Sequence, residues 1–345
     1  MANLLPLGVM AMFKLFRDNA EWQTTVVSWV FTIYVIVTLV RLTFYVIAFV
    51  AKSSSIAMIV ATATSAAVCA TLAYGVAVTR ADIVVEEFEI CHKDIPAAFD
   101  GYKIVHFSDL HIGSLLDAER EIDNLVEIIN RQEGDLVVFS GDLVHIRHSE
   151  LSERVSQKLS AIQSRDGVVA VLGNHDFMIY GFDGNLDREK AVDDLADFQT
   201  NVLGWNLLRN ESIVIAAEDS SKITFIGVDN ANYCNQGFRT IHRGDLKKAM
   251  AGTEGFRTLL SHDPSHWNAE VIPDTDIPLT LSGHTHSAQI SFFGWSPAKW
   301  SFNEIAGRYD KGNQTLYINV GLGCTAPFRI GVNPEVTVMT LRSVF

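Results

Sequence analysis

The sequence predicts a mixed α/β domain that follows two membrane-spanning helices. From Asp82 onwards, short apolar runs bounded by glycine and polar residues alternate with amphipathic segments. This alternation is typical of buried strands and surface helices. Before position 80, the chain contains two apolar stretches that each reach the roughly 20 residues needed to cross a bilayer.

The two apolar stretches, at about 24–51 and 56–78, are expected to form a helical hairpin. The second has no charged residue, and the first has only Arg41. Both are too long for the apolar core of a cleaved signal peptide. We therefore expect residues 1–81 to form a membrane region and residues 82–345 to form one soluble domain.

Flanking charges indicate which side of the membrane holds residues 82–345. Lys14, Arg17 and Arg80 flank the spans on the side of that domain, and Lys52 lies in the short connecting loop. The positive-inside bias favours the cytoplasmic face of a cell (inner) membrane, although the topology would invert if residues 24–51 held two breaks rather than one helix. The four cysteines have no CxxC spacing, which is compatible with a reducing compartment.

Within residues 82–345 the periodicity predicts eight strands and three helices. Strands are expected at 83–90, 104–107, 136–139, 168–172, 224–228, 259–261, 279–281 and 316–320, and helices at 117–132, 151–162 and 188–202.

Five of these strands are followed directly by residues of the types that can bind metals. These residues are Asp109 and His111, then Asp142, then Asn174, His175 and Asp176, then His262, and finally His284 and His286. In open α/β sheets, ligands bind beyond the carboxyl ends of the strands. Carboxylate, imidazole and amide donors together suit Mn, Fe or Zn better than Ca or Mg. Seven ligands drawn from these nine residues would be too many for one tetrahedral ion. They would suit two ions that share a carboxylate, for which Asp142 is the natural bridge.

The order Asp-x-His, Gly-Asp, Gly-Asn-His-Asp, His, Gly-His-x-His over about 102–290 resembles the calcineurin-like metallophosphoesterases. The tail from Gly321 to Thr337 is similar to the membrane-associated bacterial phosphodiesterase branch of that family. The resemblance implies a four-layer α/β/β/α sandwich. It also implies that each ion has three ligands of its own, that Asp142 bridges the ions, that His175 acts on the substrate and that Asp176 orients His175 by a hydrogen bond. The ligand sets that it implies are Asp109, His111 and His286 for the first ion, and Asn174, His262 and His284 for the second.

The resemblance further implies a metal-dependent hydrolase of phosphodiester or pyrophosphate bonds. It implies two divalent ions, for which Mn is the first choice and Fe or Zn are the alternatives. The hydroxide that bridges the ions would be the nucleophile. The membrane hairpin favours a membrane-associated substrate such as a nucleotide-activated lipid or a phospholipid. A soluble phosphomonoester substrate and a non-catalytic metal-binding scaffold are the alternatives. The net charge of −13 argues against nucleic acid as a partner, and the sequence does not indicate the oligomeric state.

Two features leave alternatives open. Many family members continue Gly-Asp-x-x-Asp, but here His145 takes the place of the last carboxylate. It either forms a supporting hydrogen bond in the site or is a solvated loop residue beside Arg147 and His148. The aromatic segment 292–302 either meets a membrane or lipid chain beside the metals, or forms a small separate core.

Overall fold

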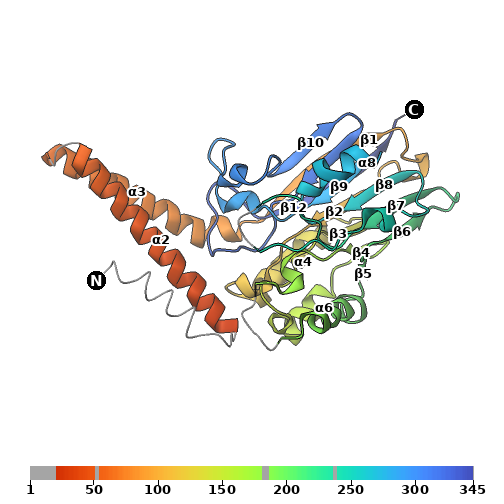
Figure 1. Ribbon diagram of the computed structural model, residues 1–345, viewed down its shortest axis with the longest axis horizontal. Coiled ribbons are helices and arrows are strands. Elements are labelled where there is room, and N and C mark those ends of the chain that lie inside the picture. Colours follow the sequence, from red (N-terminus) through yellow and green to blue (C-terminus); the bar gives the residue numbers. More distant parts are fainter. Residues whose placement is uncertain (1–20, 51–53, 181–185, 236–238, 345) are drawn as a thin grey trace.

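The computed structural model describes residues 21–50, 54–180, 186–235 and 239–344 (Figure 1). It consists of a helical hairpin that projects from a body of two mixed sheets with helices on their outer faces. This is the α/β/β/α layer order that the sequence predicts, so the fold class is confirmed.

The hairpin consists of α2 (Glu21–Val50) and α3 (Ser55–Ala77). Both helices are long and apolar enough to cross a membrane by length and composition. Helix α2 continues without a break through Arg41, so the first apolar stretch is a single helix. The Ser65 hydroxyl donates a hydrogen bond to the Val40 carbonyl at 3.2 Å and so links the two helices.

The first sheet has the strand order β1-β12-β2-β3-β4-β5. Its strands are β1 (Val84–His92), β2 (Lys103–Phe107), β3 (Leu136–Phe139), β4 (Val168–Ala170), β5 (Asn206–Leu207) and β12 (Glu335–Ser343). Strand β12 runs antiparallel to β2, while β2, β3, β4 and β5 are mutually parallel. The carboxyl ends of β2, β3 and β4 therefore meet at one edge of the sheet.

The second sheet has the order β10-β11-β9-β8-β7-β6. Its strands are β6 (Glu211–Ala216), β7 (Lys222–Gly227), β8 (Phe256–Leu260), β9 (Leu279–Ser282), β10 (Gly307–Lys311) and β11 (Gln314–Ile318). The four central strands β11, β9, β8 and β7 are parallel, and the edge strands β10 and β6 are antiparallel.

Helices cover the outer face of each sheet, which explains why the central strands read as continuous apolar runs. In β2, Ile104 packs into the core between the sheets, while Val105 packs under the helices together with Ile122 and Leu125 of α4. The α-helices of the body are α4 (Ala118–Arg131), α5 (Glu153–Leu159), α6 (Arg188–Asp197), α7 (Leu246–Ala249) and α8 (Ile272–Asp274). Short 3-10 or π turns are η2 (Thr79–Ala81), η3 (Ala97–Phe99), η4 (Ile112–Ser114), η5 (His148–Glu150), η6 (His175–Phe177), η7 (Phe198–Val202), η8 (Trp267–Val271), η9 (His286–Gln289) and η10 (Pro297–Trp300).

Candidate metal centre

The candidate ligands lie in the loops that follow β2, β3, β4, β8 and β9, where the two sheets present neighbouring carboxyl ends. Several of these residues have a left-handed backbone that is rare outside glycine. The φ angles are 51° at Asp109, 42° at His111, 63° at Asp142, 74° at His284 and 46° at His286. Such strained residues persist where the surrounding structure fixes them, and they gather at functional sites.

The residues expected for the first ion form one cluster. Oδ1 of Asp109 lies 3.4 Å from Nε2 of His286 and 3.7 Å from Nε2 of His111. The two Nε2 atoms lie 3.0 Å apart. Two imidazole nitrogens this close repel each other through their lone pairs unless a proton or a cation lies between them. The geometry therefore suits a metal.

The residues expected for the second ion form an adjoining cluster around His262. Its Nε2 atom lies 3.0 Å from Oδ1 of Asn174 and 3.2 Å from Nδ1 of His284. Oδ2 of Asp142 lies 3.0 Å from the same nitrogen and 3.6 Å from Nε2 of His111 in the first cluster. Asp142 thus lies between the two clusters, where a bridging carboxylate is expected.

The electrostatics of the cluster also suit cations. Asp109 and Asp142 are fully buried carboxylates. Burial lowers the pKa of His262, but the negative charges of Asp142 and Asp109 outweigh it and raise the pKa to about 10. These carboxylates therefore stabilise positive charge at the position that a divalent ion would take. Burial and then the charge of Arg329 lower the pKa of His286, which keeps its ring in the neutral form that binds metals.

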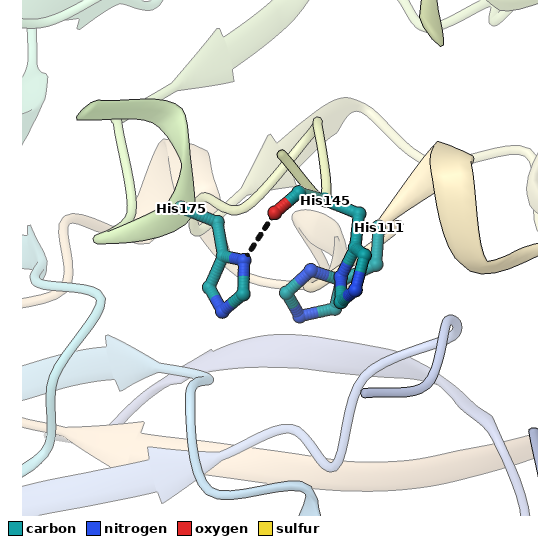
Figure 2. A group of neighbouring side chains, drawn as sticks. All are labelled: His111, His145 and His175. Carbon is teal, nitrogen blue, oxygen red and sulfur yellow. Dashed lines mark hydrogen bonds between the residues drawn. The ribbon is translucent and has the colours of Figure 1, made fainter. Parts of the chain in front are cut away.

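His175 lies beside the first cluster and is held by two loops. Its backbone N–H donates to Oδ1 of Asp142 at 2.7 Å. Its ring Nδ1 lies 2.5 Å from the carbonyl oxygen of His145 (Figure 2). A carbonyl oxygen can only accept, so Nδ1 must carry the proton and Nε2 is the atom left to act on a substrate. Burial lowers the pKa of His175.

The structure differs from the expectation for Asp176. Its carboxylate accepts hydrogen bonds from backbone N–H groups at 2.8 to 3.1 Å and is not the ring partner of His175. The donors are the amides of Asp142, Leu143, Val144 and Gly173. Because four donors occupy its two oxygens, Asp176 fixes the loops that carry Asp142 and Asn174, and the backbone of His145 orients His175 instead.

The side chain of His145 lies in the site. Its ring is stacked on that of His175 with 5.3 Å between centroids, and it lies 5.3 Å from the ring of His111 (Figure 2). The three rings form a further group with metal-binding geometry. Burial lowers the pKa of His145 to about 3, so the ring is neutral. Of the two readings left open for His145, the solvated loop residue is therefore wrong. The other, a supporting hydrogen bond, is not seen for the buried ring Nδ1, which has no hydrogen-bond partner among the described residues.

A cavity of about 460 Å³ opens over these residues. Its walls include His111, Asp142, Asn174, His175, His284 and His286, together with Tyr180, Pro297, Ala298 and Phe302. Tyr180 was not expected from the sequence. Its hydroxyl accepts from Nδ2 of Asn174 at 2.8 Å and donates to the Arg239 carbonyl at 2.9 Å, so it fixes the direction of the Asn174 amide.

Arg329 is a second residue whose role the sequence does not indicate. It is fully buried, and its Nη2 donates to the carbonyls of Val320, Gly321 and Gly323 at 2.6 to 3.0 Å. The same nitrogen lies 3.4 Å from Nδ1 of His286. Arg329 therefore braces the loop that packs against the first cluster.

Comparison with known proteins agrees with this geometry. Residues 102–288 match the calcineurin-like phosphoesterase domain. An uncharacterized metallophosphoesterase of Bacillus subtilis, YkuE, is 31% identical over 72% of this chain and 82% of its own length. A bovine transmembrane protein with a metallophosphoesterase domain is 30% identical over 72% of this chain.

The chain spans 55% of the bovine relative, so about half of that protein is compared. Among solved structures, Haemophilus influenzae NAD nucleotidase aligns over 64% of this chain and 45% of its own, with 14% identity and a TM-score of 0.41. The extent of the domain match and the identity to the Bacillus protein establish the family. The chain belongs to the calcineurin-like phosphoesterases.

Proposed function

We propose that this protein is a membrane-anchored hydrolase of a phosphodiester or pyrophosphate bond in a membrane-associated substrate, such as a nucleotide-activated lipid or a phospholipid. Family membership supports phosphoester hydrolysis by a dinuclear metal centre. The observation that carries the proposal is the meeting of two donor clusters on either side of Asp142.

The proposed ligands are the seven residues expected from the sequence. Asp109, His111 and His286 would hold one ion, Asn174, His262 and His284 would hold the other, and Asp142 lies where it could contribute to both. The mixed oxygen and nitrogen donors favour Mn, with Fe or Zn as further candidates. When bound, two such cations supply Lewis acidity to a phosphoryl oxygen and lower the pKa of a shared water.

The chain's own residues supply the remaining chemistry. The carbonyl of His145 holds the proton of His175 on Nδ1, which leaves Nε2 as the ring nitrogen available to the substrate. A ring that has taken up a second proton on Nε2, released by the attacking water, can pass it to the leaving oxygen. Asp176 acts as a positioning residue, because its contacts to four backbone amides fix the loops on which Asp142 and His175 lie.

The proposed membrane setting rests on the hairpin. Two apolar helices precede the domain, and one similar protein carries a transmembrane designation in its name. We propose that the hairpin spans the cytoplasmic (inner) membrane of the cell and that residues 82–345 face the cytoplasm. The apolar cavity wall of Pro297, Ala298 and Phe302 would suit the lipid part of a substrate.

The test is metal analysis and turnover of the purified full chain with His175→Ala. This variant should retain the bound metal but hydrolyse bis(p-nitrophenyl) phosphate about 10²- to 10⁴-fold more slowly, the range for loss of a proton-transfer group. The exposed His242 offers a matched control, and His242→Ala should hydrolyse the diester at the parent rate.

Chelation should abolish turnover, and Mn should restore it. A His175→Ala variant as active as the parent would overturn the catalytic assignment. Active protein without bound metal would overturn the mechanism. Faster turnover of p-nitrophenyl phosphate than of the diester would favour the monoesterase, and metal binding without any turnover of a lipid-phosphate panel would favour the scaffold.

A further inference from the structure

The loop that follows β9 exposes four large aromatic side chains. We call residues 292–302 the aromatic loop. Phe293 is 110% exposed and Trp300 80%, while Phe292 and Trp295 are about half exposed. The rings of Trp295 and Trp300 pack edge to face, 5.9 Å apart. Soluble surfaces rarely gather so many exposed aromatic groups without a partner.

The tip of the aromatic loop holds phenylalanine in an unfavourable conformation. The amides and carbonyls of Phe292 and Trp295 exchange hydrogen bonds at 2.8 and 2.9 Å. The two residues between them, Phe293 and Gly294, have φ angles of 49° and 79°. Tight turns with two positive φ angles favour asparagine, aspartate and glycine. A phenylalanine here is strained and points into solvent, so neither the turn nor the core explains its presence.

The aromatic loop lies next to the end of α3. The Arg329 amide donates to the carbonyl of Gly75 in α3 at 3.2 Å, and a Cβ at Gly75 would lie 2.6 Å from the Arg329 carbonyl. The Ser291 amide donates to the Ile330 carbonyl at 2.8 Å. Arg329 and Ile330 therefore connect the end of α3 to Ser291, the residue that precedes the aromatic loop. Figure 1 shows the chain between β9 and β10 at the end of the body nearest to the hairpin.

The charge of this segment differs from that of the rest of the protein. The net charge is −13, yet no Asp or Glu occurs between Asp276 and Glu304. The single cation of the aromatic loop, Lys299, donates to the Gly294 carbonyl at 2.9 Å. The aromatic loop itself therefore carries no acidic side chain that anionic headgroups would repel.

The opposite side of the aromatic loop faces the candidate metal centre. Pro297, Ala298 and Phe302 line the cavity. The ring of Phe302 packs edge to face on that of His284, 5.5 Å away. One loop therefore connects an exposed aromatic surface to the wall of the active-site cavity.

We propose that the aromatic loop docks on the lipid bilayer, with Phe293 and Trp300 inserted at the interface. Aromatic residues accumulate at this depth of the membrane, where their rings contact both headgroups and acyl chains. When the loop is docked, the cavity of the metal centre faces the membrane surface. A lipid substrate can then reach the metals without leaving the bilayer. This inference rests on the proposed membrane setting of the protein.

The test is fluorescence quenching of the full chain in vesicles that contain phosphatidylcholine brominated near the headgroup end of its acyl chains. Trp22 and Trp29 belong to the hairpin, so the signal of the aromatic loop is the difference between the parent and Trp295→Phe/Trp300→Phe. We expect this difference to be quenched by the brominated lipid. A difference signal that brominated lipid does not quench would overturn the proposal.

A second variant tests the strained tip. Phe293→Asn places a residue suited to positive φ in the turn, so the thermal unfolding midpoint should rise while quenching of Trp295 and Trp300 is lost. Val202→Asn is the matched control, because Val202 is 54% exposed and lies in η7, and it should leave quenching unchanged. Unchanged quenching in Phe293→Asn would contradict docking by the tip. Because quenching needs no turnover, its outcome is independent of whether the protein hydrolyses a phosphoester.

Discussion

Tyr180 determines which atom of Asn174 faces the metal centre. An amide can present either its oxygen or its nitrogen, and only the oxygen binds a cation. The Tyr180 hydroxyl accepts from Nδ2 at 2.8 Å, which leaves Oδ1 3.0 Å from Nε2 of His262. Burial raises the pKa of Tyr180 to about 12, so the hydroxyl keeps the proton that it donates to the Arg239 carbonyl.

Tyr180→Phe should therefore weaken metal binding at the second cluster by about 10- to 100-fold, the usual effect of losing the partner that orients a ligand. Isothermal titration calorimetry of the metal-free protein with Mn measures this change in affinity. Tyr309→Phe is the control, because its hydroxyl bonds the Ile305 amide in the described structure and is not among the residues that line the cavity. Equal Mn affinity in parent and Tyr180→Phe would exclude this role.

The contacts of His145 and Asp176 are examples of what could not be predicted from the sequence for single residues. The seven candidate ligands could be predicted because each follows a recognisable apolar run. The partner of a ring nitrogen could not be predicted, because it is a backbone carbonyl that any residue at position 145 would supply. Tyr180 likewise has no periodic signature, since the loop after η6 brings it to Asn174.

At the level of elements, Arg80 and Glu121 connect the hairpin to the body. Arg80 follows α3, and its guanidinium donates two hydrogen bonds to the Glu121 carboxylate of α4 at 2.8 and 3.1 Å. The Arg80 side chain is 6% exposed and that of Glu121 is 21% exposed. A buried cation that loses its partner is strongly destabilised, because its lost hydration is no longer offset.

Glu121→Gln should consequently lower the free energy of unfolding of the body by roughly 2 kcal/mol. This loss is smaller than that for a fully buried ion pair, because Glu121 is partly solvated. The thermal unfolding midpoint of the full chain in detergent reports this loss. Glu127→Gln removes an exposed partner of Arg131 from the same helix and should change stability by less than about 0.5 kcal/mol. Equal midpoints for the two variants would argue against the Arg80–Glu121 connection.

The strands with apolar runs were predictable and the strand order was not. The runs at 104–107, 136–139 and 279–281 correspond to β2, β3 and β9. Strand β12 (Glu335–Ser343) was missed, because its register with β1 and β2 comes from residues more than two hundred positions away. In place of the helix expected at 188–202, α6 ends at Asp197 and the chain continues as the π turn η7. The spacing of apolar residues does not distinguish an α-helix from a π turn.

At the scale of the whole molecule, the continuous α2 helix bears on the proposed membrane topology. Two breaks within residues 24–51 would have placed the body on the opposite side of the membrane from the amino-terminal end of the hairpin. Because α2 runs from Glu21 to Val50 as one helix, the hairpin that we propose to span the membrane would have the start of α2 and the end of α3 on one side. We propose that this is the cytoplasmic side, as the basic residues near both ends favour.

Cys91 allows this orientation to be measured, because it is exposed on β1. Cys69 and Cys234 are also at least partly exposed, so both are first replaced by serine. In this background a membrane-impermeant maleimide should label Cys91 only after permeabilisation of the cells, and the signal should disappear in Cys91→Ser. Lys52→Cys in the Cys91→Ser background should give the opposite pattern, because position 52 lies between the two spans. Labelling of Cys91 in intact cells would place the metal centre on the external face and would require a lipid substrate in the outer leaflet.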